Sequence, residues 1–187
     1  MKTVFFDIDS QIDFVYPAGA LYVPGAELIV PVIAELNRRA PLVISTMDAH
    51  SEDDPEFHLY PHHCVVCTTG QQKPSVTLRE KRAVIPARLD GLQQLIVEKQ
   101  KLDCFTNPNL MPLLAELNAD RYVVYGVVTE ICVRLAAFGL LKTGKRVDLV
   151  TDAVKALDEL AAKKMFDEFT ASGGRLTVSD AILGADV

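Results

Sequence analysis

The sequence predicts an α/β fold, in which a parallel β-sheet is built from strands that alternate with helices. Two observations lead to this class. Short apolar runs recur along the 187 residues, and each is nearly continuous rather than alternating, which is typical of strands buried on both faces. A helical pattern follows most of the runs. Such an alternation favours right-handed crossover connections within one parallel sheet.

Six apolar runs are expected as strands, and four segments are expected as helices. The strands are residues 3–9, 41–48, 92–99, 121–128, 146–153 and 175–181. The helices are residues 30–40, 108–118, 130–144 and 155–174, with Gly144 as the C-cap of the third. A chain of this length suits one domain with a full hydrophobic core, here residues 1–187, and no repeat or linker divides it.

Composition and charge exclude several classes of protein. The net charge is −6 and no basic stripe is present, which argues against a nucleic-acid partner. No apolar run is long enough to span a bilayer, and Asp7 interrupts the N-terminal run too early for a signal peptide. We therefore expect a cytoplasmic protein without a membrane partner. Its four cysteines should then be reduced thiols.

One long segment, residues 50–86, shows little periodicity, and long irregular segments in compact domains are usually functional. It contains every histidine of the chain: His50, His58, His62 and His63. Asp48 stands two residues before the first of them. One carboxylate with two or three imidazoles suits zinc, iron or manganese. The pattern therefore predicts a metal site, with His62 as the expected bystander; surface histidines without a ligand are the alternative.

Cys132 lies near the start of the helical pattern that follows the fourth run. If Thr129 caps this helix, Cys132 is its third residue, among backbone N–H groups without intrahelical partners. Such a position acidifies a thiol and can hold an oxyanion; a buried structural cysteine is the alternative. Asp9 and Lys99 end the first and third runs, so all three side chains should meet at one edge of the sheet. This grouping favours a nucleophilic cysteine.

The first run permits another interpretation, because an apolar strand ending in Asp7 and Asp9 resembles the opening of haloacid dehalogenase-type phosphatases. There Asp7 would be the nucleophile and Asp9 the acid/base, with magnesium as partner. In a regular strand both would share a face. Gln11 stands where those enzymes usually carry Thr or Val, and the histidines would have no role. The phosphatase is the less favoured alternative, together with a non-catalytic metal-binding protein.

Five motifs resemble the isochorismatase-like cysteine hydrolases, and within them the nicotinamidases. They are DSQIDF (9–14), MDAH (47–50), PHHCVVCTTG (61–70), EKQKLDCF (98–105) and YGVVTEICV (125–133). They follow the family's order over most of the chain. The resemblance implies a three-layer α/β/α fold with a six-stranded parallel sheet. It also implies hydrolysis of nicotinamide to nicotinate and ammonia, with another small amide or carbamoyl compound as the alternative substrate.

The resemblance assigns catalytic roles to Asp9, Lys99 and Cys132, which would act through a thioester. Lys101 competes with Lys99 for the lysine's role. The family's oxyanion hole falls on the backbone N–H groups of Val128 and Cys132. Its cis peptide bond falls between Val127 and Val128.

The resemblance also implies one divalent metal ion, with zinc expected and iron or manganese as alternatives. The implied ligands are Asp48, His50 and His63, with His58 as an additional ligand found in some members. Phe14 and Tyr60 are the expected ring-packing walls. Tyr60 stands where nicotinamidases often carry Trp, and an ordinary core position is the alternative for Phe14. A homo-oligomer, either a dimer or a tetramer, is expected by analogy with the family.

Overall fold

A parallel sheet of seven strands runs through residues 1–184, the part of the chain that the computed structural model describes. The order across the sheet is β3-β4-β2-β1-β5-β6-β7. The strands are β1 (Thr3–Ile8), β2 (Val43–Asp48), β3 (Arg82–Val84), β4 (Gln94–Lys99), β5 (Arg121–Val127), β6 (Arg146–Lys155) and β7 (Arg175–Thr177). The last three residues of the expected 1–187 domain lie outside the described residues.

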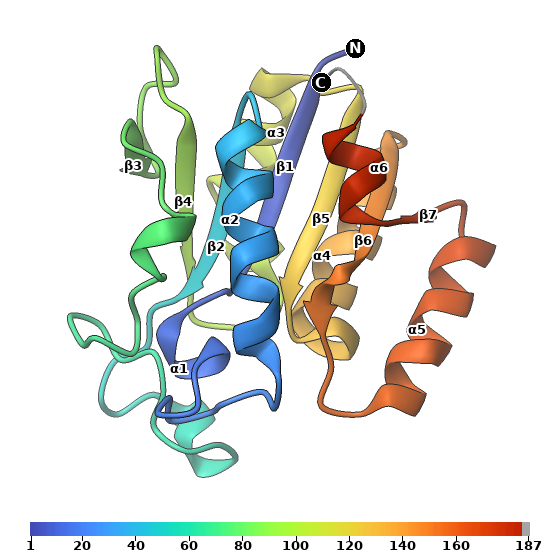
Figure 1. Cartoon of the computed structure of the whole chain (residues 1–187). Helices are drawn as coiled ribbons and strands as arrows, with labels where there is room; N and C mark the ends of the chain where they lie inside the picture. Colours follow the sequence, from blue (N-terminus) through green and yellow to red (C-terminus); the bar gives the residue numbers. More distant parts are fainter. Residues whose placement is uncertain (185–187) are drawn as a thin grey trace.

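Helices cover both faces of the sheet, as the predicted three-layer arrangement requires. Figure 1 shows α2 and α6 in front of the sheet and α3 and α4 behind it, while α5 packs beside α4. The helices are α1 (Ile12–Val15), α2 (Val30–Arg39), α3 (Leu110–Leu117), α4 (Arg134–Leu141), α5 (Glu159–Ala171) and α6 (Ser179–Leu183). The short helical turns are η1 (Ala26–Ile29), η2 (Pro55–His58), η3 (Ser75–Thr77), η4 (Cys104–Thr106) and the π-helical η5 (Thr129–Val133).

All six expected strands form, but the prediction of a six-stranded sheet is wrong because β3 adds a seventh. This strand lies inside the segment that the sequence marks as irregular. It has three residues, pairs only with β4 at the edge of the sheet, and exposes two of its side chains. An edge strand of this kind carries no apolar run, so its sequence gives no strand signal.

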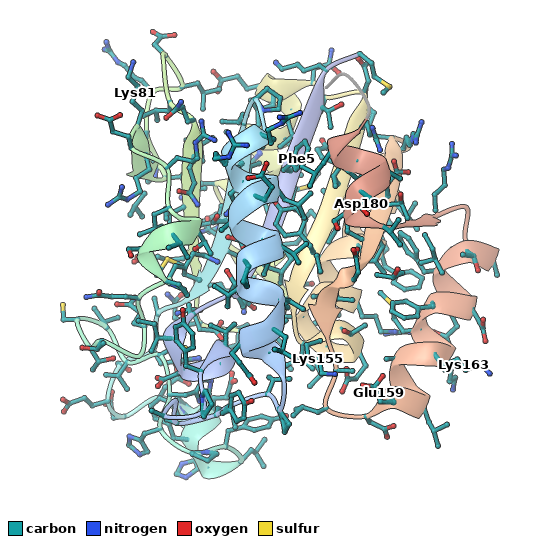
Figure 2. All side chains as sticks on the ribbon, viewed as in Figure 1. Phe5, Lys81, Lys155, Glu159, Lys163 and Asp180 are labelled. Carbon is teal, nitrogen blue, oxygen red and sulfur yellow. The ribbon has the colours of Figure 1, made fainter. Side chains whose placement is uncertain are left out.

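The core is centred on β1, whose six residues are all buried. Phe5 points from β1 toward the α2 layer (Figure 2) and packs edge-on against Tyr125, with ring centroids 6.3 Å apart. The chain leaves β1 toward β2 and returns on the other side as β5, with the crossover helices on opposite faces. In open parallel sheets such a switch point is the usual ligand site. No helix within residues 1–184 is long and apolar enough to cross a membrane.

Candidate active site

Asp9 directly follows β1 and leaves the strand conformation, with φ at 46°. Its Oδ1 accepts a hydrogen bond from Thr46 Oγ1 at 2.6 Å, whereas Asp7 accepts one from Ser45 Oγ at 3.2 Å. Ser45 and Thr46 are consecutive in β2 and therefore face opposite sides of the sheet. The expectation that Asp7 and Asp9 share a face is wrong, because the left-handed residue breaks the alternation.

Lys99, at the end of β4, joins the site from the same edge. Its side chain is buried and its Nζ lies 2.9 Å from Asp9 Oδ2, 3.9 Å from Cys132 Sγ, and within contact of Asp48 Oδ1. Burial alone would lower the pKa of Lys99, but Asp9, Cys132 and Asp48 more than offset this and raise it well above its usual range. Lys101 is exposed, so the structure brings Lys99 to the site and leaves its competitor outside.

Cys132 lies in the π-helical turn η5, immediately after β5. The N-cap of this turn is Val128, so the expected cap at Thr129 is wrong and Cys132 is one position deeper than predicted. The Val133 N–H donates to the Val128 carbonyl at 3.1 Å, which closes the wider turn of a π-helix. The peptide bond between Val127 and Val128 is cis, as the resemblance implies.

The resting Cys132 is a thiol rather than a thiolate. Burial raises its pKa, Lys99 opposes this, and the carboxylates of Asp9 and Asp48 raise it further, well above the usual range. The expected acidified thiol is therefore wrong for the resting site, because burial outweighs the helix start. A neutral thiol must lose its proton as it attacks. Asp9, whose buried Oδ2 is paired with the Lys99 ammonium at 2.9 Å, is the carboxylate placed to accept it.

A pocket that opens to solvent adjoins this group of side chains. Asp9 and Cys132 line it, and so do both expected aromatic walls, Phe14 and Tyr60, and His63. Five further apolar residues line the pocket: Leu21, Val23, Leu102, Ile131 and Leu157. Nothing in the sequence distinguished them from ordinary core residues.

Three expected metal ligands come together beside this pocket. One ligand atom each from Asp48, His50 and His63 lies within 4.8 Å of the others. His50 Nδ1 is 3.0 Å from Asp54 Oδ2, while its Nε2 is buried without a hydrogen-bond partner in the described chain. His63 Nδ1 lies 2.7 Å from the Pro61 carbonyl. Such outer contacts fix imidazoles with the other nitrogen free for a metal, so the residues present fit a divalent ion.

The structure does not bring His58 or His62 into this cluster. His58 is exposed at the end of η2. His62 is also exposed and stacks on Phe57, with ring centroids 4.2 Å apart. His62 thus lies outside the cluster, as expected. His58 lies outside it as well, because η2 turns its side chain to the surface.

One carboxylate that lies beside this cluster, Glu56, was missed by the sequence analysis. Glu56 Oε1 lies 3.9 Å from His63 Nε2, lines the pocket, and forms a second potential ligand group with His50 and Asp54. Burial lowers the pKa of His63, and it raises that of Asp48 to about 6 against the pull of Lys99. The stretch around Glu56 reads as ordinary surface charge, so only the fold reveals it.

The fold and this site are those of an enzyme of the α/β class, with reactive groups collected where parallel strands end. The chain belongs to the isochorismatase family, whose domain matches residues 3–181.

Similarity to individual proteins points to amide hydrolysis within that family. A nicotinamidase from Acinetobacter baylyi is 26% identical over 188 residues, covering 89% of this chain and 87% of its own. Pyrazinamidase of Pyrococcus horikoshii in complex with zinc superposes with a TM-score of 0.83 at 28% identity, covering 95% of this chain and 99% of that one. PnC1 from L. infantum in complex with nicotinate gives 0.81 at 26% identity, covering 96% and 94%. By its family, the protein is a hydrolase.

Proposed function

We propose that this enzyme is a metal-containing nicotinamidase that converts nicotinamide and water to nicotinate and ammonia through a cysteine thioester. One observation carries the proposal. Lys99 contacts both Asp9 and Cys132, which line one pocket, and the wall of this pocket continues into the cluster of Asp48 and His63. The relatives named for nicotinamide, pyrazinamide and nicotinate support the same substrate class. Another small amide or carbamoyl compound is the second candidate, because Tyr60 replaces the family's common Trp.

In the proposed reaction, Cys132 transfers its proton to Asp9 while the sulfur attacks the amide carbon. The backbone N–H groups of Val128 and Cys132 hold the oxyanion, an interaction whose loss typically costs about 10²–10³-fold in rate. Asp9 then gives the proton to the leaving nitrogen, and ammonia departs as the thioester forms. Water that loses a proton to Asp9 cleaves the thioester, releasing nicotinate and restoring the thiol. Lys99 pairs with the Asp9 carboxylate between these steps.

Asp48, His50 and His63 would hold the divalent ion, with Glu56 close enough to complete the ligand set. Zinc is the expected metal, since imidazole and carboxylate ligands suit it, and iron or manganese are alternatives. When bound, the ion supplies a Lewis acid that can take the ring nitrogen of the substrate. Phe14 and Tyr60 would pack against the ring and keep water from its faces. We expect this chemistry to take place in the cytoplasm, where the four free thiols would remain reduced.

The direct test is ammonia release from nicotinamide by the purified enzyme, with pyrazinamide and a panel of carbamoyl compounds measured in parallel. Turnover of nicotinamide with the highest kcat/KM supports the nicotinamidase. A clear preference for a carbamoyl compound favours the second candidate. An inactive but metal-loaded protein would overturn the proposed function.

Replacing His50 with alanine is expected to strip the metal, because its Nε2 is the buried nitrogen without another partner. The affinity for zinc should fall by more than the ~10–100-fold typical of losing an outer-shell contact. Elemental analysis and a zinc competition titration measure this, and ammonia release should fall in the same samples. His62→Ala is the matched control. Equal zinc content in both variants would contradict the proposed ligand set.

Glu130 holds one wall of the pocket in place and gives a further prediction. Its Oε1 accepts hydrogen bonds from the backbone N–H groups of Leu157 and Asp158, each at 2.9 Å. Leu157 lines the pocket. Glu130→Ala should release this wall and raise KM several-fold, with kcat changing less, because the reacting groups stay in place. Glu159→Ala, an exposed carboxylate at the start of α5 (Figure 2), is the control. A fall in kcat at unchanged KM would show that Glu130 acts elsewhere.

A further inference from the structure

A second buried ionic group lies on the α2 side of the sheet, apart from the pocket. The Lys73 side chain is fully buried, with its Nζ 3.2 Å from Asp7 Oδ1. The same ammonium donates to Ser10 Oγ at 2.9 Å, and that hydroxyl donates to Asp7 Oδ1 at 2.6 Å. None of these three residues lines the pocket. The proposed reaction therefore gives this group no chemical step.

This ionic group contacts the chain on both sides of Asp9, the residue that carries the proton in the proposed reaction. Asp7 precedes Asp9 by two positions in β1, where it is paired with Ser45 of β2, and Ser10 directly follows Asp9. Lys73 thus ties the chain on both sides of the left-handed residue. Since that conformation is sparsely populated by residues other than glycine, it persists where the surroundings hold it.

The loop that carries Lys73 is joined to the same turn by further contacts. Gln11 Nε2 donates to the carbonyls of Gln71 and Asp48, at 2.7 Å and 2.9 Å. The Ile12 N–H donates to the Gln72 carbonyl at 2.8 Å. The position of the turn after β1 is therefore set by the loop ending at Lys73, which is the loop that also contains His63.

We infer that Lys73 is a positioning residue for Asp9: through Asp7 and Ser10 it fixes the turn that aims this carboxylate at Cys132. The inference rests on the proposed function for its kinetic readout. A purely structural role would stabilise the fold without affecting proton transfer. The two roles can be separated, because Lys73 contacts the turn through Ser10 and forms its ion pair with Asp7.

Ser10→Ala removes the contact to the turn and leaves the Lys73–Asp7 ion pair. We expect kcat to fall about 10-fold or more at nearly unchanged KM, since a 1 Å misplacement of a reacting group can cost ~10²-fold. Tm should fall less than in Lys73→Met, because Ser10→Ala removes the hydrogen bonds to Lys73 and Asp7 but leaves the buried ion pair intact. Lys73→Met alone should lower Tm strongly, because Asp7 remains buried without its cation. In Asp7→Asn/Lys73→Met no buried charge is left unpaired, so Tm should recover while kcat stays low.

Lys81→Met is the control, because Lys81 is an exposed lysine at the opposite end of the molecule (Figure 2). A wild-type kcat in Ser10→Ala, or in the folded double variant, overturns the inference. Should the double variant not fold, Ser10→Ala decides alone. Alkylation of Cys132 by iodoacetamide, followed by peptide mass spectrometry, should slow in the same variants. This readout needs no amide turnover, so failure of the proposed function and failure of the inference remain distinguishable.

Discussion

Cys132→Ala is expected to lower ammonia release by about 10⁴-fold or more, the scale seen when a covalent nucleophile is removed. Cys132 lines the pocket, and no other described side chain that lines it is a thiol. The substitution removes one atom from a site that is already enclosed, so the fold should persist. Steady-state ammonia assays of the metal-loaded variant measure the effect, and thermal unfolding confirms that the protein is intact.

Cys104→Ala is the matched control for this prediction. Cys104 is also buried and burial raises its pKa to about 12, but it does not line the pocket. Its replacement should leave kcat within a few-fold of the wild type. Residual activity above about one hundredth of the wild type in Cys132→Ala, once contamination is excluded, would refute the thioester route, because activity without the nucleophile is typically far lower.

Lys99→Met is expected to damage both stability and activity. It leaves the carboxylates of Asp9 and Asp48 buried without the cation that both contact, and breaking a buried ion pair from one side costs about 3–5 kcal/mol. The free energy of unfolding in urea measures this loss. Under conditions where the variant is folded, kcat/KM should fall by up to ~10²–10⁴-fold, the usual contribution of a positioned proton-transfer group, because Asp9 loses the cation that holds it.

Lys101→Met provides the comparison, since this lysine is two positions away but exposed. Its replacement should change the free energy of unfolding by less than about 0.5 kcal/mol, as for most surface substitutions. Equal effects of the two substitutions would mean that the buried ammonium does not hold the site together. If Lys99→Met retains its metal but loses turnover, the effect of Lys99 on proton transfer is separated from any effect on metal binding.

The strands and the grouping of Asp9, Lys99 and Cys132 were predictable because both depend on local pattern. Strands buried on two faces leave continuous apolar runs, and parallel strands bring the residues at their ends to one edge. β3 (Arg82–Val84) was not predicted, because an exposed edge strand has no such apolar run. The family motifs supplied the candidate metal ligands His50 and His63, which no periodicity could have paired.

The remaining differences arise from long-range packing. Glu56 enters the site only because η2 turns one carboxylate inward and His58 outward. The high pKa of Cys132 depends on burial and on carboxylates brought from β1 and β2, so the position within a helical turn could not reveal it. The separation of Asp7 from Asp9 results from one backbone angle at Asp9, where the sequence shows only an apolar strand ending in acids.

The order of strands across the sheet has a consequence for how activity arises during folding. Asp9 and Cys132 follow two strands that touch, β1 and β5, yet the chain between them must first build β2 and β4 on the far side. No continuous fragment shorter than residues 9–132 can contain both groups. Turnover should therefore return late in refolding, when the second half of the sheet docks, and it would report completion of the domain rather than collapse of its parts.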